Sequence, residues 1–355
     1  MTAIPPKLKM QIGPRDTYVI DMAHDGGSSL ACSTTSKDVT IVDILIGQVL
    51  HKHCIEEEIV GVHYVNQVLY YLDKKLNIHQ VDKRAIEYPT CKPLSVPLKF
   101  EDVTACAFTE NYIAFATSCK DETTGDAAGS GNESDDDVSR HDERSPIWVF
   151  DMRNMEQVLV ETDAHSDVVS SLAFKGGDLL ISGGVDGLVN VIDIKAPEDE
   201  YVQATIPVDS AVDRVGVFSI KNTNMFYATT EDSRWNLLRM NGSEDVDNVI
   251  KRRVRKERML VDMVGLPRDD FPIATIEYCV EDSRMHLIGS SLDGTRSSII
   301  GEYDFHKELP RVAKFCEGTL FTGGEDGFIA GFQVDLRDGD GKTMKDRFKS
   351  RANPY

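Results

Sequence analysis

Short stretches of alternating apolar and polar residues recur along the whole chain, and each is ended by a turn rich in glycine or aspartate. The clearest unit spans residues 165–194. It contains the stretch DVVSSLAF, a Gly-Gly turn, the strand DLLISGG, a VDG turn and the strand LVNVIDI. Alternation with a period of two residues predicts half-buried strands, and short glycine-containing turns between them predict hairpins. The unit therefore predicts three consecutive antiparallel strands.

The same pattern returns near the carboxyl end, where TGGEDG at residues 322–327 matches SGGVDG at residues 182–187 in type at almost every position. Weaker copies are found at residues 28–44, 67–82, 225–240 and 285–305, and one copy is split between 112–119 and 146–151. Seven units therefore repeat along the chain.

An acidic residue closes the third predicted strand of six units: Asp43, Asp82, Asp151, Asp193, Asp304 and Asp335. Asp43 and Asp82 are 39 residues apart and Asp151 and Asp193 are 42 apart, close to the roughly 40 to 45 residues of a four-stranded propeller blade. One such sheet cannot cover its own apolar faces and must pack on neighbours. The repeat therefore predicts an all-β, seven-bladed β-propeller.

The ring needs a closing strand, because the seventh unit lacks a fourth strand before the chain becomes highly charged. Residues 8–12, LKMQI, precede the first complete unit. We expect this N-terminal strand to pair with the last blade and so remove an exposed sheet edge.

These turn motifs resemble those of the WD40-repeat family, whose repeats end in Trp-Asp and often open with Gly-His. The likeness spans nearly the whole chain. It implies a WD40-type propeller over residues 1–335, followed by a basic C-terminal tail at 336–355. Members of this family mostly act as platforms for other proteins. The expected function is therefore a non-catalytic intracellular scaffold for protein–protein interactions.

Composition narrows the classes of partner. Acidic residues number 59 against 39 basic ones, and a net charge of −20 makes nucleic acid an unlikely ligand. The longest apolar runs, such as residues 68–72, are too short for a membrane span. The N-terminal residues lack the apolar stretch of a secretory signal, so we expect a cytoplasmic or nuclear protein.

Neither a metal nor a cofactor is expected. The seven cysteines form no Cys-x-x-Cys pair, which predicts free thiols rather than disulfides or a zinc site. The run His51-Lys52-His53-Cys54 offers soft ligands, but alternation along a strand places both histidines on one face and Cys54 on the other.

One set of residues has the types of a serine hydrolase triad: His165, Ser182 and Asp186. The family resemblance implies instead a structural hydrogen-bond relay within a blade, and it assigns Thr322 and Asp326 to a second copy. A hydrolase is the weakest alternative, because no Gly-x-Ser-x-Gly elbow is present.

The relay of this family usually includes a tryptophan on the third strand. In the unit at residues 165–194 that position is Ile192. We therefore expect this relay to end one link early.

Residues 120–144 contain nine acidic and three basic residues and almost no apolar side chain. This composition predicts a disordered insertion, because little surface can be buried to offset the ordering entropy. It could repel competitors, attract the basic tails of histones or ribosomal proteins, or accept phosphate at Ser130 or Ser134. A role in ribosome or chromatin assembly is thus an alternative function, and a tolerated expansion without function is another.

A basic run stands out against the acidic background. It contains Lys251, Arg252, Arg253, Arg255 and Lys256. Such runs can be nuclear import signals. The alternation of VIKRRVRKERML is equally compatible with an exposed outer strand.

A last pattern concerns ubiquitin ligases. Phe150-Asp151-Met152-Arg153 resembles the Trp-Asp-x-Arg box with which some WD40 proteins dock on the adaptor of cullin-4 ligases, with Phe150 in place of tryptophan. An arginine fork beyond the strand offers planar contacts to a partner. The chain could therefore be a substrate receptor of such a ligase, although Lys195 and Arg337 follow their closing aspartates in the same way.

Overall fold

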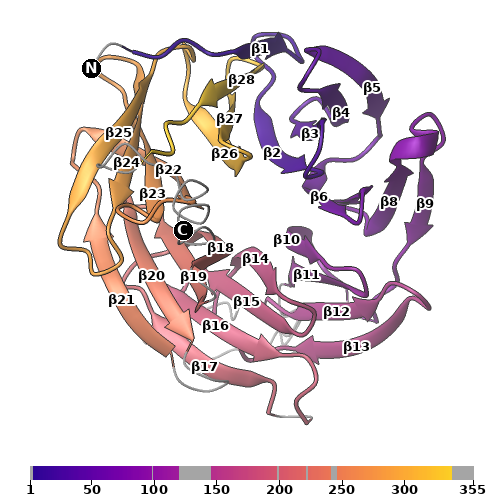
Figure 1. Cartoon of the computed structure of the whole chain (residues 1–355). Helices are drawn as coiled ribbons and strands as arrows, with labels where there is room; N and C mark the ends of the chain where they lie inside the picture. The colour runs from indigo at the N-terminus through magenta and orange to yellow at the C-terminus, as the bar shows by residue number, and fades with distance from the viewer. Residues whose placement is uncertain are drawn as a thin grey trace, which may run out of the picture.

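The alternating segments fold as strands of a closed ring. The computed structural model describes residues 3–97, 99–119, 145–197, 200–220, 223–240 and 246–337. In this part of the chain, strands β1 to β28 form seven four-stranded antiparallel sheets. Figure 1 shows the sheets arranged in chain order around a central axis. The prediction of a seven-bladed β-propeller is therefore confirmed.

Each blade is a meander of four consecutive strands, apart from the last. Blade 1 consists of β2 (Val19–His24), β3 (Ser29–Thr34), β4 (Asp38–Asp43) and β5 (Gln48–Cys54). Blade 2 consists of β6 (Ile59–Val65), β7 (Val68–Asp73), β8 (Asn77–Asp82) and β9 (Thr90–Pro93), with the short helix η1 (Lys83–Ala85) between the last two. Blade 3 consists of β10 (Asp102–Phe108), β11 (Tyr112–Ser118), β12 (Ile147–Asp151) and β13 (Glu156–Glu161).

The second half of the ring follows the same plan. Blade 4 consists of β14 (Val169–Lys175), β15 (Leu179–Gly184), β16 (Leu188–Asp193) and β17 (Val202–Pro207). Blade 5 consists of β18 (Val212–Ile220), β19 (Thr223–Thr230), β20 (Arg234–Met240) and β21 (Val246–Arg253). Blade 6 consists of β22 (Arg258–Gly265), β23 (Ile273–Cys279), β24 (Arg284–Ser290) and β25 (Ser297–Tyr303). Blade 7 joins β1 (Leu8–Gln11) to β26 (Pro310–Cys316), β27 (Thr319–Gly324) and β28 (Phe328–Gln333).

The N-terminal strand closes the ring as expected. Strand β1 pairs antiparallel with β28, from Leu8 opposite Gly331 to Gln11 opposite Phe328. The backbone amide of Ile12 donates to the carbonyl of Gly327 at 2.9 Å and extends this pairing by one residue. The two ends of the repeat array are thus joined through backbone hydrogen bonds.

The hydrophobic core is divided among the contacts between blades. Seven clusters of buried apolar side chains are present, and each contains residues from two adjacent blades. The cluster between blades 7 and 1, for example, packs Val19 and Leu30 with Val312 and Phe321. No blade therefore completes its core without both neighbours.

The innermost strand of every blade carries the same irregularity. Near the start of each, the pairing register with the second strand shifts by one residue, as between Val212 and Arg214 in blade 5. A bulge of this kind re-aims the side chains that follow it and strengthens the local twist.

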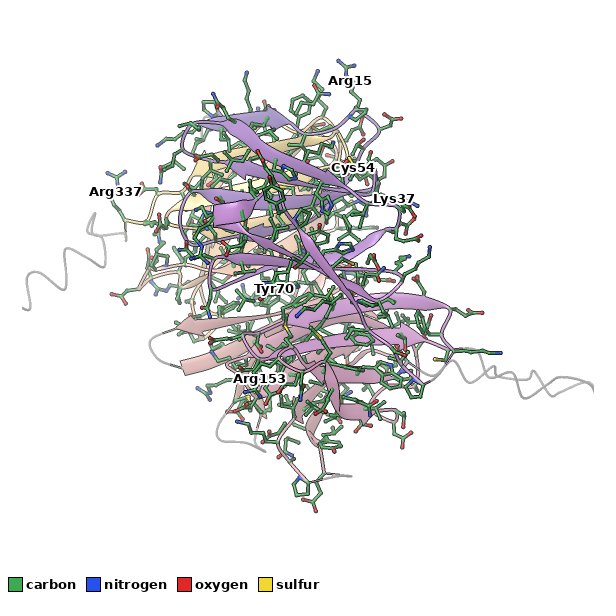
Figure 2. The ribbon with its side chains drawn as sticks, turned by 90° about the vertical axis from the view of Figure 1, so that its right-hand side faces the viewer. Arg15, Lys37, Cys54, Tyr70, Arg153 and Arg337 are labelled. Carbon is green, nitrogen blue, oxygen red and sulfur yellow. The ribbon has the colours of Figure 1, made fainter. Side chains whose placement is uncertain are left out.

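The two rims of the ring carry different connections. Because neighbouring strands are antiparallel, the turns between second and third strands share one rim with the connections between blades. We call this rim face A and the other face B. Figure 2 shows Lys37 and Cys54 toward face A on the right and Arg337 toward face B on the left.

The strand assignment made from sequence for blade 6 was wrong. The pattern at residues 285–305, with Asp304 as the closing acid, predicts the second and third strands of this blade. These residues form the third and fourth strands, β24 and β25, and β23 is the second. The error has a physical reason, because adjacent antiparallel hairpins show the same alternation and turn chemistry.

Several expectations lie outside the described residues. These are the disordered acidic insertion at 120–144, the phosphate acceptors Ser130 and Ser134, and all but the first two residues of the tail at 336–355. In the part of the chain that the structure covers, no helix has the length and apolar character needed to cross a membrane.

Removing the closing strand should weaken the entire ring. A variant that lacks residues 1–12 exposes the edge of β28 and loses the backbone pairing with β1, so we predict a lower Tm by circular dichroism. Adding a synthetic peptide of residues 3–13 should restore much of the loss. An unchanged Tm in the truncated variant would show that β1 does not hold the ring closed.

Candidate functional site

The predicted relay of blade 4 is present and buried. Nε2 of His165 lies 2.8 Å from Oγ of Ser182, and its Nδ1 lies 3.1 Å from both carboxylate oxygens of Asp186. Because an ionised carboxylate only accepts hydrogen bonds, Nδ1 donates and Nε2 accepts from the serine hydroxyl. The side chain of His165 is fully buried. The relay therefore ties the connection before blade 4 to its second strand and to the following turn.

Blade 7 contains the second copy, completed by a histidine that the sequence interpretation missed. Nε2 of His306 lies 2.8 Å from Oγ1 of Thr322, and Nδ1 lies 3.1 Å from Asp326. The spacing in the sequence could have identified this histidine, because His306 precedes Thr322 by 16 residues and His165 precedes Ser182 by 17.

The Gly-Gly pairs of these blades are explained by what packs against them. A Cβ on Gly184 would lie 2.4 Å from Nδ1 of His165, and one on Gly183 would lie 2.5 Å from Val212 of the next blade. The corresponding contacts in blade 7 are made by His306 and by Val19. The first glycine therefore admits the neighbouring blade and the second admits the relay histidine.

The relay of blade 4 is longer than expected. Ile192 takes no part, but Asn190, which pairs with Ser182 in the sheet register, places Nδ2 3.1 Å from Nε2 of His165. Its Oδ1 accepts a hydrogen bond from Thr205 on the fourth strand at 2.6 Å. The expectation that the relay ends one link early is therefore wrong, because the bonding position on β16 is two residues before Ile192.

The relay changes the titration of its carboxylates. Burial alone would raise the pKa of Asp186, but hydrogen bonds from His165 and from the amides of Leu188 and Ser166 outweigh it and lower the pKa. The pKa of Asp326 is lowered by the corresponding balance of burial against His306. Both carboxylates are therefore held in the charged form in the folded protein.

The hydrolase reading of these residues meets a steric obstacle. Ser182 is completely buried between its neighbouring strands, and its hydroxyl is used by His165. A substrate carbonyl cannot reach the serine without opening the blade. The geometry is that of a relay that holds the fold together.

An ion pair inside the channel was not predicted. Nη1 of Arg214 on β18 lies 2.8 Å from Oδ2 of Asp262 on β22, and the hydroxyl of Tyr227 donates to Oδ1 at 2.8 Å. Burial opposes the charge on Arg214, but the carboxylate of Asp262 outweighs it and raises the pKa. The sequence signal was weak, because Arg214 and Asp262 are not the only charged residues of their strands, which also contain Asp213 and Arg258.

This ion pair lies between two cavities of the channel. The cavity toward face B has a volume of about 430 Å³ and is lined by Phe108, Phe174, Phe218 and Phe315. The cavity toward face A has a volume of about 510 Å³. Arg214 lines both cavities.

The mouth on face A exposes apolar side chains. Tyr18, Ile20 and Met259 line the cavity there and are 41%, 37% and 42% exposed. Leu309 and Arg311, at the start of blade 7 between blades 6 and 1, line the same cavity. This mouth is concave, mostly apolar and bordered by charge, which is the composition of a protein docking surface.

The residues predicted for adaptor docking lie at the end of β12. Phe150 and Asp151 are buried, whereas the side chain of Arg153 is 69% exposed. Nε of Arg153 donates to both oxygens of Asp151, at 2.9 and 3.1 Å, and this bond lowers the pKa of Asp151 to about 2. The same clamp joins Asp82 to Arg84 and Asp335 to Arg337.

The remaining candidates are dispersed. The rings of His51 and His53 lie 6.4 Å apart on β5, and none of the seven cysteines forms a disulfide. In the described residues no group of three metal-ligating side chains converges. Of the predicted import signal, Lys251, Arg252 and Arg253 end the outer strand β21, while Arg255 and Lys256 follow it as exposed residues. Import by this run stays a prediction.

Comparison with known proteins supports the fold. No protein-family model matches the chain. A chain of the solved structure described as "Crystal Structure of Mitotic Checkpoint Complex" is similar to this one with a TM-score of 0.69 and 14% sequence identity, over 93% of this chain and 92% of that chain. Since 1655 solved chains match, the likeness selects a fold and not a function. The fold that the structure and this likeness show is a closed seven-bladed β-propeller.

Replacing a relay carboxylate should destabilise the fold in a pH-dependent way. We predict that Asp186→Asn lowers the free energy of unfolding at pH 7 by about 1 to 3 kcal/mol. Because the pKa of Asp186 is lowered in the folded state, its contribution is present above about pH 4 and is lost as the pH falls through the folded pKa. Denaturant titrations at pH 7 and pH 3 should show the gap to wild type shrinking. Asp304→Asn, at an exposed site, is the control, and a gap independent of pH would refute the assignment.

Proposed function

We propose that the protein is a non-catalytic intracellular scaffold that binds other proteins at the channel mouth of face A. The carrying observation is the exposure of Tyr18, Ile20 and Met259 around one concave opening. Large apolar side chains that remain accessible on a rigid surface are typical of docking sites, since their burial by a partner is favourable.

The charges around the opening support this role. Arg311 is about half exposed and is fixed by Glu325, whose carboxylate accepts from Nε at 2.5 Å. A pre-positioned arginine beside apolar residues gives a partner both an anchor and an orientation. The likeness to a chain from a structure described as a complex is consistent with protein partners.

The proposal includes the absence of catalysis. Ser182 and Thr322 each have a histidine and an acid at hand, and both side chains are fully buried inside their blades. Within the WD40 family, SGGVDGLVNVIDI and TGGEDG resemble stretches of WD repeat-containing protein eighty-nine, and we infer a kinship with that subfamily.

Charge placed at the mouth of face A should abolish partner recovery. We predict that Tyr18→Glu combined with Met259→Glu removes the principal partners found by proximity labelling and mass spectrometry. The matched control is Leu45→Glu combined with Ile46→Glu, which charges equally apolar and more exposed residues on face B. Retention of the partners by the first variant, or their loss from the control, would contradict docking at face A.

Docking on a cullin-4 adaptor is the second proposed function, favoured by the rigid, exposed position of Arg153 on face B. Arg153→Ala should abolish co-purification of the adaptor and leave folding intact. Arg84→Ala removes an identical clamp from blade 2 and should have no effect. Equal recovery of the adaptor with all three proteins would reject this function.

A further inference from the structure

A basic groove lies between the outer strand of blade 5 and the sheet of blade 6. Figure 1 shows β21 near β24 and β25 at the outer edge of the ring. Between them lies a cavity of about 250 Å³, and four arginines line it: Arg252, Arg253, Arg255 and Arg258. Its floor and far wall are formed by Trp235, Glu277 and small hydroxyl side chains of blade 6.

Two of the arginines hold the walls of the groove in place. Nη1 of Arg258 lies 3.2 Å from the buried carboxylate of Glu277, whose other oxygen accepts from Thr275 at 2.9 Å. Arg252 donates to the backbone carbonyl of Gly294 and so bridges blade 5 to blade 6. The charge of the single acid that lines the groove is therefore already neutralised.

The other two arginines are available to a ligand. Arg253 and Arg255 are exposed, and within the described part of the chain neither side chain forms a hydrogen bond or an ion pair. Arg253 feels the charge of Asp232, but Arg234 already binds that carboxylate at 2.7 Å. Val254, between them, is buried and anchors this segment. Two guanidinium groups are thus directed to one small cavity by a fixed backbone.

The side chains that line the groove are suited to binding a phosphate group. Two guanidinium groups beside serine hydroxyls can bind the oxygens of a phosphate dianion in bidentate fashion. The partly exposed side chains of Ile288 and Ile299 offer apolar surface to the residues around such a group. The cavity has room for one anionic side chain and not for a continuous polyanion.

The net charge of the chain also favours a single phosphate group over an extended polyanion as the ligand. A protein with a charge of −20 repels nucleic acid and anionic bilayers over their whole length. A short segment with one phosphorylated residue experiences chiefly the field of the groove, because charges more than about 10 Å away are screened at physiological ionic strength.

We propose that this groove binds a phosphorylated serine or threonine in an extended segment of a partner protein, with Arg253 and Arg255 as the phosphate-binding residues. The proposal deepens the scaffold function and rests on it, since it names one class of partner. It places recognition at the outer end of the junction between blades 5 and 6, in a cavity that shares no lining residue with the channel mouth.

The test uses the full chain and two degenerate peptide libraries, one with a central phosphoserine and one with serine. Immobilised protein should enrich the phosphoserine library at least about tenfold over the serine library. Arg253→Gln combined with Arg255→Gln should abolish the enrichment. Arg15→Gln combined with Lys92→Gln removes the same charge at two other exposed positions and should preserve it. Figure 2 shows Arg15 at the edge of the ring.

Three outcomes would overturn the proposal. These are equal capture of the two libraries, equal capture by wild type and the Arg253/Arg255 variant, and tighter Arg253/Arg255-dependent binding of single-stranded RNA or of phosphatidylserine vesicles. The variant with Tyr18→Glu and Met259→Glu should still enrich the phosphoserine library. Failure of the groove therefore remains distinguishable from failure of docking at face A.

Discussion

Packing between adjacent sheets is the interaction on which the rest of this structure depends. Each blade is two-faced and only four strands wide, and the buried apolar residues of the described chain gather in seven clusters that each join two blades. A four-stranded sheet alone would leave both apolar faces in water. Only a closed ring covers both apolar faces of every blade. The four-residue pairing of β1 with β28 closes the ring and therefore affects the stability of all the blades.

The same constraint explains why the sequence predicts the fold well and the site less well. Strand alternation, Gly-Gly turns and closing aspartates are local, so the seven units and the closing strand could be predicted. In blade 6 the local pattern did not determine which hairpin came first, and Asp304 was misplaced. Asn190 and the ion pair of Arg214 with Asp262 depend on register, bulges and the closeness of different blades, which no local pattern reports.

In a rigid ring of this kind, the two faces and the outer edge remain available for binding other molecules. The relay histidines hold the strands of a blade together, and Arg214 binds Asp262 of the adjacent blade. Tyr18, Ile20 and Met259 expose apolar surface at the channel mouth of face A, whereas Arg253 and Arg255 carry positive charge at the junction of blades 5 and 6. An apolar surface and a positively charged surface on one rigid ring could bind two different segments of a partner protein.

Native-state hydrogen exchange tests most directly whether the blades stabilise one another. If each core is shared by two blades, the amides of the seven innermost strands should exchange through one global opening, with similar free energies in every blade. Protection that differs by several kcal/mol from blade to blade, with single blades opening while the others remain closed, would show that the sheets are stable individually and would contradict this account.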